Sequence, residues 1–218
     1  MTGKTAVVFG GTGLVGSELV RELESDERYS AVRVFVRRDT EFAGDKVRVI
    51  KVNVPEADSY ASDIEGDELF ICLGTTIKKA GSVMAMEAAD RDLPAEIASA
   101  AVKNGIKAVA VVSSIGADAG SRNYYMRIKG EMEESIASAG FERTVIVRPS
   151  ILLGKRNEYR FGEEVGKMIM KLFSYLLVGR LRKYRGIEAR DVACAMIRLI
   201  NDSSDTARVY YESDSLQA

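Results

Sequence analysis

The sequence predicts an α/β fold, a doubly wound parallel sheet with a small subdomain at its C-terminal end. Short apolar runs rich in valine and isoleucine alternate with longer segments whose apolar residues recur at helical spacing. The runs are apolar on nearly every residue, which is typical of parallel strands that are covered on both faces. The 218 residues contain no Pro/Gly/Ser-rich linker, so we expect one domain over residues 1–218.

The expected elements repeat a β-α-β order. The expected strands are 5–9, 31–36, 47–52, 69–73, 108–112 and 143–147, and the expected helices are 14–24, 83–104 and 124–139. Right-handed crossovers place the carboxyl ends of such strands along one edge of the sheet, where ligands bind.

The pattern changes after Pro149. Residues 159–178 have helical spacing, Asp191 is placed to cap a last helix, and residues 207–211 suggest a late strand. We therefore expect residues from about 150 to 218 to contribute a small substrate-side subdomain, a cap over the edge of the sheet.

Composition limits the partners and the location. The 31 basic and 32 acidic residues nearly balance, so no nucleic-acid partner is expected. No apolar stretch is long enough to span a bilayer, and the N-terminal residues enter a strand at once, without room for a signal peptide. Cys72 and Cys194 each lie in an apolar run, which indicates buried thiols in a reducing compartment and favours the cytoplasm.

The absence of histidine excludes several kinds of site. Ser-His-Asp and Cys-His nucleophile systems and H-E-x-x-H metal sites all need this residue, and two isolated cysteines cannot form a zinc site. No metal is therefore expected. Proton chemistry near neutral pH must use Tyr, Lys, Asp or Glu side chains, or a cofactor.

The stretch AVVFGGTGLVGSEL (6–19) predicts a phosphate-binding turn. Two glycine patterns fit it, and the end of the strand at Phe9 favours the one that begins at Gly10, because a glycine inside a strand weakens it. Gly10 then makes the tight turn, Gly13 lets a pyrophosphate approach the backbone, and Gly16 lets the helix pack closely. The N–H groups of the first helical turn, at about Leu14 and Val15, would face the anion.

The end of the second strand indicates which dinucleotide is bound. Arg37 and Arg38 stand where a carboxylate would hold the ribose 2′-OH of NAD, and arginine instead suits a 2′-phosphate. NADP(H) is therefore favoured over NAD(H), although Asp39 follows directly.

A tyrosine and a lysine form the candidate catalytic pair. Tyr125 and Lys129 are four residues apart on an expected helix and so share one face, where an ammonium beside a phenol favours the phenolate. That arrangement supplies a general acid and base without histidine. Ser113 and Ser114 follow the strand 108–112, where a hydroxyl can hydrogen-bond a substrate carbonyl, whereas Tyr124 is one residue out of place and is expected to pack.

Together these motifs resemble those of the short-chain dehydrogenase/reductases. More narrowly, the chain resembles the atypical, NmrA-like group with an NAD(P)-binding Rossmann fold, and is most similar to the Tat-interactive-protein-like NADPH-binding oxidoreductases. The resemblance runs from about residue 4 to about residue 200. Its segments are GGTGLVG, VRR, CLGTTIKKAG, VVSSIGAD, YYMRIKGEME and VRPSILLG.

The resemblance implies roles for particular residues. Tyr125 would be the acid/base, Lys129 would bind the nicotinamide ribose, and Ser114, with Ser113 as the alternative, would complete the catalytic set. The implied cofactor contacts are Thr12, Gly13, Leu14 and Val15 at the pyrophosphate, Arg37 and Arg38 at the 2′-phosphate, Leu73 and Gly74 on the adenosine side, and Pro149 to Ile151 beside the nicotinamide. Asn53 stands where many members have an aspartate that holds the adenine, and the family's catalytic asparagine has no match.

Two functions remain open at this point. The first is an NADPH-dependent oxidoreductase that acts on a carbonyl or alcohol of a small molecule, as a monomer or homodimer. The alternative is a non-catalytic NADP(H)-binding redox sensor that docks on a protein partner. Residues 165–186 carry six basic and no acidic residues, which allows membrane contact, but a helix packed on its own core is favoured.

Overall fold

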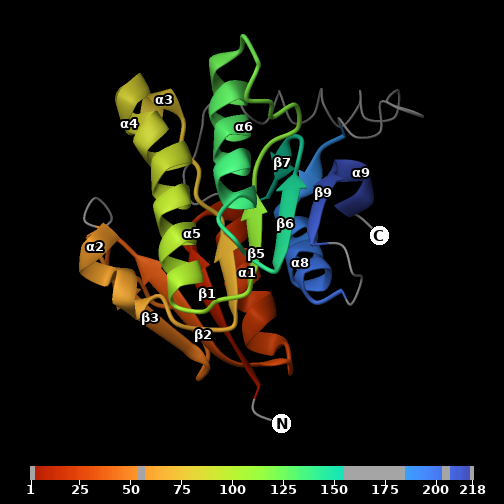
Figure 1. Cartoon of the computed structure of the whole chain (residues 1–218). Helices are drawn as coiled ribbons and strands as arrows, with labels where there is room; N and C mark the ends of the chain where they lie inside the picture. The colour runs from red at the N-terminus through yellow and green to blue at the C-terminus, as the bar shows by residue number, and fades with distance from the viewer. Residues whose placement is uncertain (1–2, 54–56, 155–184, 203–206, 217–218) are drawn as a thin grey trace.

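The structure is a computed structural model that describes residues 3–53, 57–154, 185–202 and 207–216. Its centre is a seven-stranded sheet in the order β3-β2-β1-β4-β5-β6-β9, in which each neighbouring pair is parallel. The predicted doubly wound α/β fold is thereby confirmed (Figure 1). The strands are β1 (Lys4–Phe9), β2 (Tyr29–Val36), β3 (Val47–Lys51), β4 (Glu68–Ile71), β5 (Ala108–Val112), β6 (Arg143–Arg148) and β9 (Arg208–Glu212).

Helices cover both faces of the sheet. One apolar core joins the sheet to α1 and α8, and a second joins its other face to α5 and α6. The main helices are α1 (Leu14–Ser25), α4 (Val83–Glu87), α5 (Leu93–Lys103), α6 (Tyr124–Ala137) and α8 (Ala189–Ile200). Short elements complete the described chain: α2 (Ala57–Tyr60), η1 (Ala61–Asp63), α3 (Ile77–Ala80), β7 (Leu152–Leu153), β8 (Ile187–Glu188) and α9 (Ser213–Leu216).

The strand order predicts where a ligand would bind on the sheet. The chain runs outward from β1 to β2 and β3, then returns to pair β4 with the other side of β1. Ligands of doubly wound sheets bind at the carboxyl ends of the strands at such a reversal. The segments after β1 and β4 therefore form the two sides of the candidate site, and α6 rises beside them (Figure 1).

The helix expected over residues 83–104 contains an unpredicted wide turn. Residues Ala88–Asp92 form one π-helical turn between α4 and α5. Such turns insert one extra residue into a helix and are frequent at functional sites. Hydrophobic periodicity predicted one uninterrupted helix here, because the apolar residues on each side of the turn keep helical spacing.

Several expectations at the edges of the fold need correction. The last helix begins at Ala189 with Glu188 as its N-cap, so Asp191 lies inside its first turn and does not cap it. β3 is an edge strand with exposed residues rather than a strand covered on both faces. Cys194 is exposed and Cys72 is half-buried, so the two thiols are not both buried.

Much of the chain after Pro149 belongs to the main body. β9, the expected late strand, pairs with β6 and extends the sheet, while α8 packs on the face that α1 also covers. The expected helix at 159–178 and most of the basic segment 165–186 lie outside the described residues. The cap expected over the sheet edge therefore stays a prediction.

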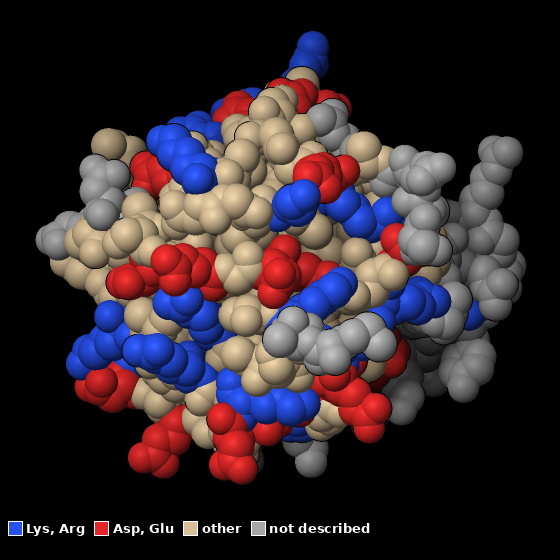
Figure 2. Space-filling model, turned by 60° about the horizontal axis from the view of Figure 1, so that its bottom comes forward, with Lys and Arg blue, Asp and Glu red and all other residues tan. Residues whose placement is uncertain are grey.

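Two observations concern membrane contact and surface charge. In the parts of the chain that the structure covers, no helix is both long and apolar enough to cross a bilayer. On the face that Figure 2 shows, acidic and basic side chains are interspersed.

Candidate functional site

The turn between β1 and α1 has the geometry that a pyrophosphate requires. Gly10 follows the last strand residue and has φ +82°, and a Cβ there would lie 2.5 Å from the Cys72 carbonyl oxygen. A Cβ at Gly16 would lie 2.1 Å from the Gly10 carbonyl oxygen, so the helix packs directly on the turn. Gly13 is exposed at the N-cap of α1, which no side chain caps. The first N–H groups of α1 thus remain available to an anion.

Two further glycines show how closely neighbouring segments approach this turn. A Cβ at Gly11 would lie 2.5 Å from Val34 Cγ1 on β2, so Gly11 is also needed, for packing rather than for a ligand. A Cβ at Gly154 would lie 2.8 Å from Leu14 Cδ1, which places the segment after β6 beside the start of α1. Thr12 is exposed, whereas Val15 is buried in the core.

The end of β2 carries exposed charges. Arg37 and Arg38 follow the strand directly and are exposed. Asp39, which could compete with them, is in an ion pair with Lys51, with Oδ2 and Nζ 2.7 Å apart. The hydrogen bond from Lys51 also lowers the pKa of Asp39 below its ordinary value. Asn53 is exposed beyond the end of β3, and no contact of its side chain is described.

Helix α6 carries the candidate catalytic pair on one face. The Asn123 side chain accepts a hydrogen bond from the Met126 N–H and so fixes the start of the helix beside Tyr125, which is half-buried. One turn later, the Lys129 side chain is only 3% exposed. Its Nζ lies 3.3 Å from Oδ2 of Asp90, whose side chain is closed to solvent.

Lys129 reaches the end of β4. A Cβ at Gly74 would lie 3.9 Å from Lys129 Nζ, so the loop after β4 passes directly beside the ammonium. Leu73 is half-buried and packs on the core shared with α5. The resemblance implied that Gly74 lies on the adenosine side, and the structure adds that this glycine adjoins the lysine expected at the nicotinamide ribose.

The two candidate serines have different surroundings. Ser113 is 5% exposed, and its Oγ has no hydrogen-bond partner among the described residues. Ser114 is half-buried, and its hydroxyl makes one long hydrogen bond of 3.5 Å to the Ile115 carbonyl oxygen. Both hydroxyls are therefore little engaged by the protein. A hydroxyl without a protein partner at the carboxyl end of a strand is able to hydrogen-bond a polar ligand.

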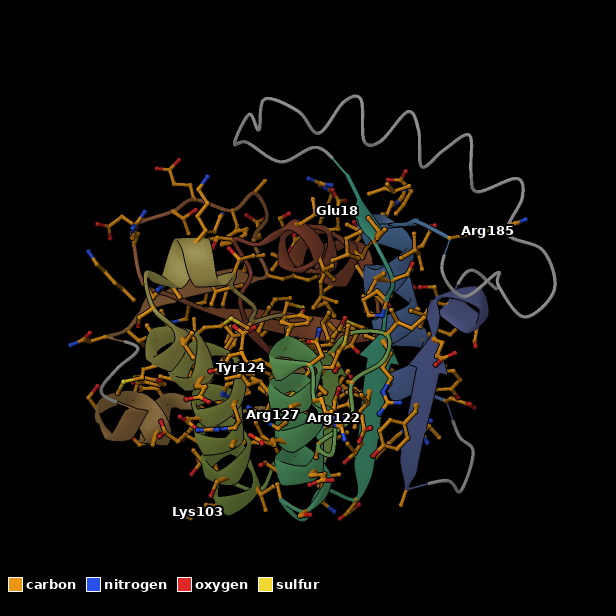
Figure 3. The ribbon with its side chains drawn as sticks, turned by 90° about the horizontal axis from the view of Figure 1, so that it is seen from above. Glu18, Lys103, Arg122, Tyr124, Arg127 and Arg185 are labelled. Carbon is orange, nitrogen blue, oxygen red and sulfur yellow. The ribbon has the colours of Figure 1, made fainter. Side chains whose placement is uncertain are left out.

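Tyr124 is held away from this arrangement. Its hydroxyl donates to the Val83 carbonyl oxygen at 3.3 Å, and Arg127 lies 5.4 Å from its ring centroid (Figure 3). Desolvation and the neighbouring Glu87 raise its pKa, which keeps the phenol protonated. These contacts agree with the expectation that Tyr124 packs.

The loop after β6 is fixed at three backbone positions. Ile115 N–H donates to the Pro149 carbonyl oxygen at 3.0 Å, Ser150 N–H donates to Ser213 Oγ at 2.7 Å, and Ile187 N–H donates to the Ile151 carbonyl oxygen at 3.0 Å. Pro149 is buried, and the Ile151 side chain is 45% exposed. The loop thus presents an apolar side chain from a rigid backbone.

Sequence reasoning missed Asp90. It lies in the charged run ADRD, which reads as a solvent-exposed stretch. One signal was available: Met86, Asp90, Leu93 and Ile97 lie at helical spacing, so the aspartate interrupts an apolar stripe. The other three are buried in the core, and Asp90 is buried with them.

The donor set suits a dinucleotide. It combines an uncapped helix N-terminus, two arginines at the end of β2 and a buried lysine beside the end of β4. Among the described residues, no group of three or more Cys, Asp or Glu side chains is arranged to hold a metal ion.

The comparisons with known proteins agree with this site. A family model described as NAD(P)H-binding matches residues 10–203. A mitochondrial protein FMP52 of Candida albicans is 34% identical over 168 residues, which are 74% of this chain and 73% of that protein. FMP52 of Candida glabrata is 31% identical and covers 100% of this chain and 96% of its own length.

Solved structures show the same fold at low identity. The UDP-Glc/GlcNAc 4-epimerase of Campylobacter jejuni matches with a TM-score of 0.72 at 12% identity, over 99% of this chain and 82% of that chain. MoeE5 in complex with UDP-glucose and NAD matches with a TM-score of 0.70 at 14% identity, over 97% and 79% of the two chains.

The relatives overturn the expected location. They are named as mitochondrial proteins, which contradicts the expectation of a cytoplasmic protein. The physical reason for the error is that reduced thiols indicate reducing surroundings without separating one reducing compartment from another. The family model matches most of the chain and decides the family. The chain belongs to the NAD(P)H-binding family, alongside the FMP52 proteins, and has the Rossmann-type fold of short-chain dehydrogenases and epimerases.

Proposed function

We propose that this protein is an NADPH-dependent oxidoreductase that reduces a carbonyl, or oxidises the corresponding alcohol, of a small molecule. The observation that carries the proposal is the position of Lys129. Its ammonium is buried beside Gly74 at the end of β4 and lies one helical turn from Tyr125. A lysine closed to solvent at the ligand-binding edge of a sheet supports a role in a site rather than on a surface.

The residues of the chain would divide the work as follows. Bound NADPH supplies the hydride. Tyr125 donates a proton to the carbonyl oxygen, while the Lys129 ammonium stabilises the phenolate that remains. Ser114 donates a hydrogen bond to the same carbonyl oxygen and orients it, with Ser113 as the alternative donor. In the oxidising direction, the phenolate accepts the alcohol proton.

The preference for NADPH rests on the end of β2. Arg37 and Arg38 are exposed there, and guanidinium groups pair well with a phosphate. The ion pair with Lys51 offsets the charge of Asp39, the acid that otherwise suits a free ribose 2′-OH. Both observations favour the phosphorylated dinucleotide.

Cofactor binding and turnover test the proposal together. The intact chain is titrated with NADPH and NADH by fluorescence, and NADPH oxidation is then followed with a panel of aldehydes and ketones. We expect tighter binding of NADPH and turnover of at least one carbonyl. Tight NADPH binding without turnover would instead support the redox sensor, and no binding of either dinucleotide would contradict both functions.

A further inference from the structure

Asp90 is a buried carboxylate in an unusual part of a helix. It lies in the π-helical turn Ala88–Asp92, and its exposed fraction is 0%. An ionised carboxylate in the interior is costly unless charges or hydrogen bonds compensate it. Its two oxygens therefore need partners, and these partners indicate what the residue does.

The two oxygens face two different segments of the candidate site. Oδ1 accepts a hydrogen bond from the Thr75 N–H at 2.7 Å, in the loop after β4. Oδ2 lies 3.3 Å from Lys129 Nζ on α6 and accepts no hydrogen bond from the described residues. A Cβ at Gly74 would lie 4.0 Å from the same oxygen. One carboxylate thus connects the loop after β4 to the buried lysine.

Asp90 is also the counter-charge of that lysine. Within the described part of the chain, no other acid lies within ion-pair distance of Lys129. Glu133, the next acid along the same face of α6, is paired with Arg148 instead. The contact with Asp90 is an ion pair without hydrogen-bond geometry, so the N–H groups of Lys129 stay available to other acceptors.

We propose that Asp90 is a positioning residue that holds the Lys129 ammonium toward the dinucleotide and fixes the loop at Gly74 and Thr75 beside it. The inference rests on the proposed function, because that function assigns the ribose and Tyr125 to Lys129. The π-helical turn gives the carboxylate its reach. Without the inserted residue, the positions before Asp90 would rotate relative to α5, and the contact with α6 would change.

Two substitutions separate the two contacts. Asp90→Asn keeps an oxygen for the Thr75 N–H but removes the charge that faces Lys129. Asp90→Ala removes the whole carboxylate and so loses both contacts, the one with the Thr75 N–H and the one with Lys129. Asp92→Asn is the matched control, because Asp92 has the same charge on the same turn, but its side chain is 46% exposed and is paired with Arg91.

Thermal unfolding of the cofactor-free protein tests the ion pair independently of activity. In wild type, Asp90→Asn leaves a buried ammonium without its counter-charge, and we expect the Tm to fall by roughly 5–15 °C. In a Lys129→Met background the same substitution removes an unpaired buried carboxylate, so the Tm should rise by roughly 5 °C. The double variant has a neutral pair and is expected to fold even where a single variant does not. If Asp90→Asn shifted the Tm by the same amount and in the same direction in both backgrounds, the ion pair between Asp90 and Lys129 would be contradicted.

Cofactor binding and turnover test the positioning role. Asp90→Asn should lower kcat by roughly tenfold to a hundredfold while the NADPH Kd changes by less than about threefold. Asp90→Ala should also raise the NADPH Kd by roughly tenfold, because the loop at Thr75 is released. Adding Asp90→Asn to Lys129→Met should lower kcat no further. Asp92→Asn should match wild type throughout.

The outcomes distinguish this inference from the proposed function. If the wild-type chain binds NADPH but reduces no carbonyl, the proposed function fails, and the unfolding cycle with the NADPH titration of Asp90→Ala still decides the role of Asp90. Two results would contradict the positioning role while the proposed function stands, given that the wild-type protein reduces a carbonyl. Either Asp90→Asn has the kcat of wild type, or the loss of kcat in the double variant equals the product of the losses in Asp90→Asn and Lys129→Met.

Discussion

The Lys51 ammonium lies 2.7 Å from the Asp39 carboxylate, across the carboxyl ends of β3 and β2. Strand pairing sets this contact, because Lys51 is in register with Val36, the last residue of β2. Arg37 and Arg38 are exposed beside this pair, and within the described residues neither has an ion pair. Lys51 is therefore expected to contribute to the choice between the two dinucleotides without binding either.

Removal of Lys51 should weaken the preference for NADPH. In Lys51→Met the carboxylate of Asp39 repels a 2′-phosphate and can accept a hydrogen bond from a free 2′-OH. We expect the ratio of the NADH Kd to the NADPH Kd to fall by roughly twofold to fivefold, since exposed charges are screened. Asp39→Asn in the same background should restore the ratio, and Lys107→Met, far from this corner, should not change it. An unchanged ratio in Lys51→Met would contradict the role of the pair.

Removal of either arginine should affect one dinucleotide only. Arg37→Ala or Arg38→Ala should raise the NADPH Kd by roughly tenfold to a hundredfold, because each loses a charged hydrogen bond to the 2′-phosphate. The NADH Kd should change by less than about threefold. Fluorescence titrations at low and high salt measure both, and the NADPH effect should shrink as salt increases. Equal losses for both dinucleotides would place the arginines elsewhere.

Alanine substitutions at two glycines of the turn should affect different properties, one the stability and the other cofactor binding. Gly16→Ala puts a Cβ 2.1 Å from the Gly10 carbonyl oxygen, so we expect the Tm to fall by roughly 3–12 °C. A Cβ at Gly13 would lie 3.2 Å from the Gly10 carbonyl oxygen and 3.8 Å from the Cys72 carbonyl oxygen, so Gly13→Ala should lower the Tm less than Gly16→Ala does. Its methyl group stands where the pyrophosphate approaches, so the NADPH Kd should rise by at least roughly tenfold. A Gly13→Ala variant that binds NADPH normally would remove the pyrophosphate from this turn.

The two cysteines should react with maleimide at very different rates. Cys72 is half-buried as a residue, but desolvation of its thiol raises the pKa from its ordinary value of 9.0 to about 12, so the thiolate is scarce until the solution is strongly alkaline. Cys194 is exposed on α8, and its pKa is raised chiefly by partial burial. Mass spectrometry at pH near 8 should find one adduct, on Cys194. Stability that depends on the neutral Cys72 thiol should be lost as the pH rises from about 9 to about 12. An adduct on Cys72 before one on Cys194 would contradict the desolvation of the Cys72 thiol.

The sequence predicted the strands well because their signal is local. Runs such as AVVF and AVAVV are apolar on nearly every residue, and the structure buries them in the centre of the sheet. The start of the last helix was misplaced, because Asp191 is a preferred N-cap residue, whereas the helix begins at Ala189 after Glu188, whose side chain makes no capping hydrogen bond. α3, with four residues, was too short to show any periodicity.

The motifs of the sequence propose most of the candidate site, whereas a residue that joins it only through a tertiary contact has no such signal. The glycine turn and the Tyr125–Lys129 spacing are visible in the sequence, and the structure brings Lys129 beside Gly74. Asp90 is 39 residues from Lys129 along the chain and has no motif, so packing alone reveals the pair.

Turnover by Tyr125→Phe tests the central proposal most directly. The substitution removes one hydroxyl and keeps the ring, and Tyr124→Phe is the matched control one residue away. With a carbonyl that wild type reduces, Tyr125→Phe should lower kcat by roughly a hundredfold to ten-thousandfold. Its NADPH Kd should stay within about threefold of wild type, and Tyr124→Phe should keep its activity. Turnover by Tyr125→Phe as fast as wild type would contradict the acid/base role of Tyr125 and the mechanism built on it.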